Sequence, residues 1–136
     1  MFKKISHVAI AVKSIDDALV RYTQVLGLSL KCTEEIKEQK TRVAMLPVGE
    51  SRLELVQGTE AESPVCKFIE AHGEGVHHIA LEVDDIDSSL RLLKFAGLKL
   101  IDEKPRIGAE GAKIAFVHPK GTNGVLLELI QPKKES

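Results

Sequence analysis

The sequence has few of the residues that mark several familiar classes of protein. It contains no tryptophan and one tyrosine, and aromatic residues make up only 4% of its 136 positions. Such a composition disfavours a pocket built to stack flat rings. The two cysteines, Cys32 and Cys66, have neither the spacing of a metal site nor the number that a disulfide framework needs. We therefore expect free thiols and a cytoplasmic protein.

An excess of charge of one sign and long apolar runs are also missing. The net charge is −1, so the overall balance does not draw the chain to nucleic acid or to an anionic membrane. No stretch approaches the roughly 20 apolar residues of a membrane span. The short apolar run near the N-terminus is interrupted by Ser6 and His7, which is a poor pattern for a signal peptide. The sequence predicts neither a nucleic-acid partner nor a membrane partner.

One segment of the sequence occurs twice. The stretch "HVAIAVKSIDDAL" begins at His7 and "HIALEVDDIDSSL" begins at His78, 71 residues later, and six of their thirteen positions are identical. Each copy opens with apolar residues that alternate with small or polar ones, which is the period of a strand. Ser14 in the first copy and Asp85 in the second are placed to cap the helix that follows. The sequence thus predicts the same strand and helix twice.

Three further strands are predicted after each helix. They are "LSLKCTEEI", "TRVAML" and "SRLELVQ" in the first copy, and "LKLIDEK", "AKIAFVHP" and "GVLLELIQ" in the second. The two modules run from about 4 to 57 and from about 76 to 132, and a linker of about 58 to 75 joins them. Neither half is large enough to bury a good core alone. We therefore predict an α+β fold in which two paired βαβββ modules form one pseudo-twofold domain over residues 1–136.

Histidines and glutamates recur at matching places in this repeat. His7 and His78 begin the first strands, and Glu54 and Glu128 lie in the last strands, 47 and 50 residues further on. Strand alternation places all four side chains opposite the apolar layer. Two imidazoles and two carboxylates that converge in one cleft suit a divalent metal ion of borderline hardness, and carboxylates buried without a cation would be costly. The repeat predicts a metal-binding cleft with these four residues as ligands.

With these residues in place, the chain resembles the vicinal oxygen chelate superfamily over nearly its whole length, and within it the methylmalonyl-CoA epimerases. Further blocks that carry the resemblance are "ESPVCKFIEAHGEGVHHIALEV", "DEKPRIGAEGAKIAFVHPK" and "GVLLELIQP". The resemblance implies one divalent metal ion (Co, Mn, Ni, Zn or Mg) on His7, His78 and Glu128, with Glu54 where some members have glutamine. It also implies an acyl-CoA substrate and a homodimer.

The same resemblance implies a reaction, the interconversion of the (R) and (S) forms of methylmalonyl-CoA at C2. This reaction needs an acid/base group on each face of a planar intermediate. Glu128 matches a position proposed in the family to act as a base as well as a ligand. Some epimerases carry a second glutamate where this sequence has Val43. Glu54 or a metal-bound water would have to take its place.

Several residues near the C-terminal end are candidate substrate contacts. His118, in "HPKG", is either a turn residue or a contact for the acyl carboxylate. Lys113 lies beside a glycine hairpin that could meet the substrate. Lys120 and Arg106 could bind the CoA phosphates, although surface cations often have no specific partner. We include Lys113, His118 and Lys120 among the predicted substrate-binding residues.

Other activities remain open at this point. Glyoxalase I, a lyase that acts on the glutathione hemithioacetal, uses a near-identical set of metal ligands. An extradiol-type dioxygenase uses two histidines and one glutamate around iron, but a fourth ligand and a sequence poor in aromatic residues disfavour it. A drug-sequestering member of the superfamily would normally lack the metal ligands. Methylglyoxal with glutathione, acyl-CoA and antibiotics are the ligands that would separate these hypotheses.

Overall fold

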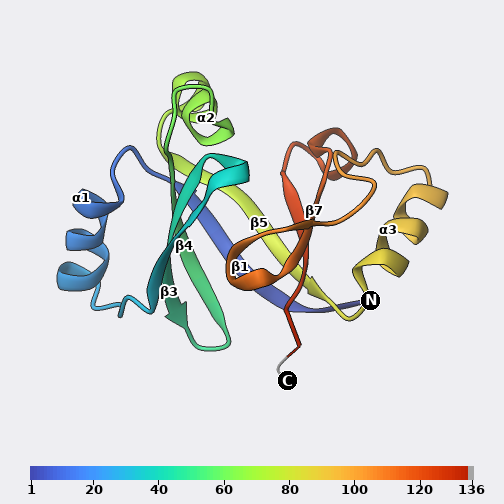
Figure 1. The fold of residues 1–136 in the computed structure, drawn as a ribbon, viewed down its shortest axis with the longest axis horizontal. Coiled ribbons are helices and arrows are strands. Elements are labelled where there is room, and N and C mark those ends of the chain that lie inside the picture. Colours follow the sequence, from blue (N-terminus) through green and yellow to red (C-terminus); the bar gives the residue numbers. More distant parts are fainter. Residues whose placement is uncertain (135–136) are drawn as a thin grey trace. The chain divides into compact units, whose positions relative to one another are not determined.

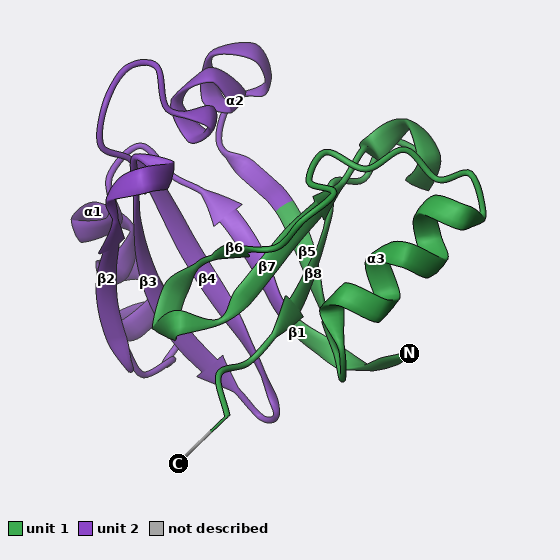
Figure 2. Ribbon diagram, turned by 45° about the vertical axis from the view of Figure 1, so that its right-hand side comes forward, with its two compact units in different colours: residues 1–6, 78–136 green, residues 7–77 purple. Residues whose placement is uncertain are grey.

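The computed structural model describes residues 1–134, and the chain divides into two compact units. Unit 2 consists of His7–His77, and unit 1 combines Met1–Ser6 with the chain from His78 onward (Figure 2). Each unit mixes helices with parallel and antiparallel strand pairs, which confirms the predicted α+β class. Within the described part of the chain, every helix is too short or too polar to span a membrane.

Unit 2 contains four strands in the order β2-β3-β4-β1. β3 runs antiparallel to both β2 and β4, whereas β1 runs parallel to β4. Its elements are β1 (Phe2–Ala11), which begins in unit 1, α1 (Ile15–Leu19), the π-helical turn η1 (Val20–Val25), β2 (Cys32–Ile36), η2 (Lys37–Gln39), β3 (Thr41–Val48), β4 (Ser51–Gly58) and α2 (Pro64–His72) (Figure 1).

Unit 1 repeats this plan with strands in the order β5-β8-β7-β6. β7 is antiparallel to β6 and β8, and β5 is parallel to β8. Its elements are β5 (Gly75–Val83), which begins in unit 2, α3 (Ile86–Phe95), β6 (Arg106–Ile107), η3 (Ala109–Gly111), β7 (Lys113–Val117), η4 (Pro119–Thr122) and β8 (Leu127–Gln131) (Figure 1).

The two helices that follow the repeated strands begin in the same way. The Ser14 hydroxyl accepts a hydrogen bond from the Asp17 N–H at 3.1 Å, and the Asp85 carboxylate accepts one from the Ser88 N–H at 3.2 Å. Both caps are therefore confirmed. A glutamine on the last strand of each unit also reaches the first helical residue. The two bonds are Ile15 N–H to Gln57 Oε1 at 2.8 Å and Ile86 N–H to Gln131 Oε1 at 2.9 Å.

The prediction of a strand at "LKLIDEK" is wrong. This segment makes only one isolated bridge, from Leu100 to Val117. Ile101 N–H and Asp102 N–H both donate to the Phe116 carbonyl, at 2.9 and 3.2 Å. The Asp102 carboxylate then accepts the Phe116 N–H at 2.9 Å. The Asp102 side chain thus takes the Phe116 N–H, which the backbone of a neighbouring strand would otherwise accept. Strand pairing along this edge of β7 ends there. The predicted strand "LSLKCTEEI" is likewise shorter than expected, since β2 begins only at Cys32.

Candidate metal centre

His7 and Glu54 lie together in unit 2. In the parallel pair of β1 and β4, Ala9 is opposite Glu54, so His7 stands one alternation before the glutamate on the same face of the sheet. The His7 Nδ1 atom is 3.2 Å from Glu54 Oε2. Both residues are buried, with 3% and 4% of their surfaces exposed. Because of this register, His7 and Glu54 form one imidazole–carboxylate pair although they lie far apart in the sequence.

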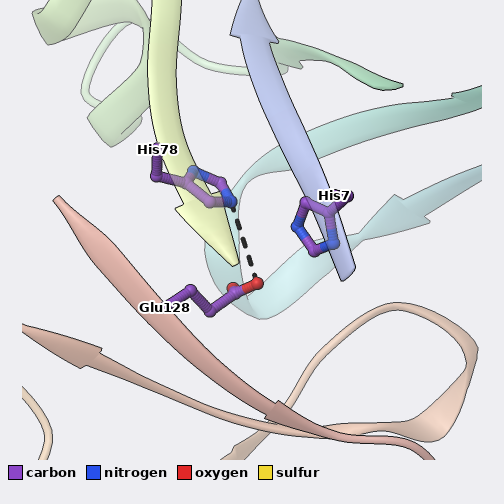
Figure 3. A group of neighbouring side chains, drawn as sticks. All are labelled: His7, His78 and Glu128. Carbon is purple, nitrogen blue, oxygen red and sulfur yellow. Dashed lines mark ion pairs between the residues drawn. The ribbon is translucent and has the colours of Figure 1, made fainter. Parts of the chain in front are cut away.

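His78 and Glu128 repeat this arrangement in unit 1. Ala80 is opposite Glu128 in the parallel pair of β5 and β8, as Ala9 is opposite Glu54. The His78 Nε2 atom is 3.8 Å from Glu128 Oε1 (Figure 3). These residues are also buried, with 8% and 4% of their surfaces exposed. The internal repeat of the sequence thus extends to the register of the strands and to the pairing of the side chains.

The chemistry of these side chains suits a divalent cation. His7, His78 and Glu128 are all buried, and each offers one atom that could bind a metal ion. Burial lowers the pKa of His7 from 6.5 to about 4, although the nearby Glu54 carboxylate opposes this shift. His7 is therefore neutral at pH 7, and a neutral imidazole has a lone pair available for a metal. The described donors fit the kind of ion that the sequence predicted.

The lowered pKa of His7 predicts how the stability of the metal-free protein depends on pH. The folded-state pKa of about 4 lies below the unfolded value of 6.5, so protons bind preferentially to the unfolded chain. Stability from this group is present above pH 6.5 and is lost as the pH falls toward 4. Between pH 7 and pH 5 we expect a loss of about 2 kcal/mol, measured by urea unfolding of chelator-treated protein. In His7→Gln that part of the pH dependence should disappear; an unchanged pH dependence would contradict the expectation.

Arg52 makes the surroundings of the His7/Glu54 pair differ from those of the His78/Glu128 pair. Its Nε–H donates to Glu54 Oε2 at 2.7 Å, so this buried carboxylate has a cation beside it as well as His7. The position that matches Arg52 in the repeat is Leu126, which carries no charge. Arg52 was not among the predicted site residues, although its spacing of two residues from Glu54 on a strand was a signal that both side chains share a face. The structure therefore distinguishes two glutamates that occupy matching positions in the repeat.

The remaining predicted site residues lie in different settings. Val43, which stands where some epimerases carry a glutamate, is buried and pairs with Val56. His118 Nδ1 accepts the Lys120 N–H at 3.1 Å, which is the turn role considered for this histidine. Lys113 and Lys120 are exposed, and within residues 1–134 neither side chain forms an ion pair. Their proposed contacts with substrate remain predictions.

Comparisons with known proteins agree on one family. Residues 6–116 match the family model described as the Glyoxalase/Bleomycin resistance protein/Dioxygenase superfamily. The uncharacterized protein YqjC of Bacillus subtilis is 45% identical over 130 residues, which cover 96% of this chain and 93% of that protein. The ethylmalonyl-CoA/methylmalonyl-CoA epimerase of Cereibacter sphaeroides is 34% identical over 133 residues, covering 96% of this chain and 99% of the relative. A solved structure of a variant Streptomyces coelicolor methylmalonyl-CoA epimerase, in complex with 2-nitronate-propionyl-CoA, is 35% identical with a TM-score of 0.95, covering 100% of this chain and 99% of the other.

Proposed function

Because this chain belongs to the glyoxalase/bleomycin resistance protein/dioxygenase superfamily, we propose that it is a metal-dependent epimerase that interconverts (R)- and (S)-methylmalonyl-CoA. The observation that carries the proposal is the repeated, buried His/Glu pair, with the same strand register in both units. The similarity to epimerases, one of them bound to an acyl-CoA analogue, supports an acyl-CoA as the substrate.

His7, His78 and Glu128 are the residues that we propose hold the metal, with Glu54 as a further ligand or neighbour. When bound, a divalent ion would supply positive charge that stabilises the negative charge developing on the substrate as its C2 proton leaves. The neutral state of His7 at pH 7 and the burial of the carboxylate of Glu128 support this assignment. The expected ion is Co, Mn, Ni, Zn or Mg.

The two glutamates supply the proton chemistry in this proposal. Glu128 removes the C2 proton, because a carboxylate is the type of base that this weakly acidic position requires. Glu54 is the carboxylate that we assign to the opposite face, since Val43 has no group that can carry a proton. The hydrogen bond from Arg52 holds the Glu54 carboxylate in one orientation, which favours directed return of the proton.

Two further parts of the proposal concern the setting of the enzyme. Homodimer formation and a cytoplasmic location both remain predictions. Light scattering on the purified protein measures the first, and fractionation of the source cells measures the second.

Proton exchange with solvent tests the reaction itself. In D₂O, starting from one pure epimer, the product epimer should gain deuterium at C2 in essentially every turnover. The physical reason is that the acid which returns the proton equilibrates with water between turnovers. The starting epimer should gain deuterium more slowly, because the first base must exchange its proton before returning it. Proton NMR of the C2 position, with mass spectrometry of the separated epimers, measures both quantities.

The same experiment distinguishes the alternatives. Product that forms quickly and keeps its original protium would indicate a single shuttling base and would contradict the two-face mechanism. An absence of both product formation and exchange above the spontaneous rates would contradict the epimerase proposal. Parallel assays with methylglyoxal and glutathione would identify glyoxalase I activity, and equilibrium dialysis with antibiotics would identify a drug-binding protein.

A further inference from the structure

The Asp102 carboxylate, on an irregular segment of unit 1, contacts both the backbone of Phe116 and the side chain of Arg106. Asp102 follows α3 in the segment that was wrongly predicted as a strand, and its Oδ2 accepts the Phe116 N–H at 2.9 Å. Arg106 approaches the same carboxylate with two nitrogens, Nε at 3.2 Å from Oδ1 and Nη2 at 3.3 Å from Oδ2. Two contacts to one carboxylate fix the planes of both groups. Asp102 therefore ties the backbone of β7 to a guanidinium group.

Phe116 connects this carboxylate to the candidate metal centre. It lies opposite Glu128 in the antiparallel pair of β7 and β8. Its ring is 5.2 Å from the ring of His78, at an interplanar angle of 89°, which is the edge-to-face geometry that aromatic pairs prefer. The Arg106 guanidinium carbon lies 5.9 Å from the centroid of the same phenyl ring, within the range of a cation–π contact. A continuous series of contacts thus runs from Asp102 and Arg106 through Phe116 to His78.

We propose that Asp102 and Arg106 are positioning residues that act through Phe116 to hold the His78 imidazole in its metal-binding orientation. An imidazole binds a metal well only when its ring plane and ligating nitrogen are fixed by neighbouring groups. The phenyl ring limits rotation of the imidazole, and the Asp102–Arg106 pair limits movement of the phenyl ring. This inference rests on the metal site of the proposed function, and it assigns a role to residues outside the predicted ligand set.

The repeat supplies an internal comparison for this role. Met45 lies opposite Glu54 in unit 2, in the place that Phe116 takes opposite Glu128. After the matching segments "GLSL" and "GLKL", the Lys31 N–H donates to the Met45 carbonyl at 2.8 Å, as the Ile101 N–H donates to the Phe116 carbonyl at 2.9 Å. Cys32 therefore stands in the place of Asp102. Unit 2 therefore keeps the backbone contact but has neither the ring nor the carboxylate. We call Asp102, Arg106 and Phe116 the clamp. It contacts His78, and the matching positions around His7 do not reproduce it.

Cobalt(II) binding to the full-length protein tests the clamp without any substrate. The variants are Asp102→Ala, which removes both contacts, Asp102→Asn, which keeps an oxygen for the Phe116 N–H, and Phe116→Met, which copies the side chain of unit 2. Glu103→Ala is the matched control, because Glu103 lies in the same segment and its ion pair with Lys94 is exposed. Affinity is measured by competition with a chelating dye, and ligand geometry by the visible absorption spectrum of bound cobalt.

We expect Asp102→Ala and Phe116→Met to weaken cobalt binding by about 10- to 100-fold and to change the cobalt spectrum. Asp102→Asn should lie between these variants and the wild type, and Glu103→Ala should match the wild type in both measurements. A merely structural role would lower the unfolding temperature and leave the spectrum of the folded fraction unchanged. Where Asp102→Ala fails to fold, Phe116→Met and Arg106→Gln decide the question.

Two results would overturn the inference. One is a folded Asp102→Ala or Phe116→Met protein with the affinity and spectrum of the wild type. The other is a wild-type protein that binds no cobalt, which would also remove the metal from the proposed function. Failure of the epimerase proposal alone looks different: the wild type would be inactive on methylmalonyl-CoA while the variants still altered cobalt binding, and the clamp would stand.

Discussion

Replacing Glu128 by glutamine should reduce the epimerisation of methylmalonyl-CoA by at least about 10²–10⁴-fold. Glutamine keeps the size of the side chain but cannot act as a base, and it also replaces the charged carboxylate of a proposed metal ligand by a neutral amide. Glu128 is buried, and its Oε1 atom lies 3.8 Å from His78 Nε2. The loss of the base and the loss of the carboxylate charge therefore affect the same site. The measurement is kcat from separated epimers, together with the rate of C2 deuterium uptake in D₂O. Exchange should fall in parallel with epimerisation, because both begin with the same proton removal.

Glu54→Gln is the matched control for this prediction. Its amide oxygen can still accept the hydrogen bond from Arg52 Nε, and some members of the superfamily have glutamine at this place. We expect the variant to keep its metal and to retain measurable activity, because a proton from solvent can still reach the planar intermediate. The loss of epimerase activity in Glu54→Gln should therefore be smaller than the loss in Glu128→Gln. Equal and mild effects from both substitutions would show that the base lies elsewhere.

The second large effect concerns the metal. Purified protein should carry close to one divalent ion per chain, and His78→Ala should lose most of it. Removing one imidazole from the proposed set of buried ligands would take away a bond to the metal and leave a gap that water would have to fill. Elemental analysis by mass spectrometry after dialysis measures the stoichiometry directly.

His77→Ala provides a close comparison for the loss at His78. His77 is the preceding residue on the strand and therefore faces the other way. Its ring instead contacts Phe68, at 4.9 Å between ring centroids. We expect His77→Ala to keep its metal. Full activity after exhaustive chelation, with the metal verified absent, would contradict the whole assignment.

The repeated strands and helix starts could be predicted from the sequence because the signals are local. Ser14 and Asp85 cap their helices as expected, and the parity of His7 and His78 on their strands was readable from alternation alone. The pairing of each histidine with its glutamate required more, namely the register of two strands far apart in the chain. The internal repeat supplied that information, since one register had to serve both copies.

The parts that could not be predicted depend on contacts between side chains and backbone. The alternation of "LKLIDEK" suggested a strand, but nothing local showed that the Asp102 carboxylate would take the Phe116 N–H. In the same way, an aromatic residue in "AKIAFVHP" reads as core, and only the folded structure places Phe116 against His78. Arg52 lies between these cases, because its spacing from Glu54 was visible but its hydrogen bond was not.

The membership of the first six residues in unit 1 has a consequence for how the protein is made. Met1–Ser6 belongs with the chain from His78 onward, and the Lys3 ammonium lies 3.4 Å from Asp84 and 3.7 Å from Glu82. A ribosome adds about 5–20 residues per second, so the residues that these six contact are synthesised on the order of ten seconds later. All of unit 2 has been synthesised before that, at a time when the N-terminal segment still lacks the rest of its own unit.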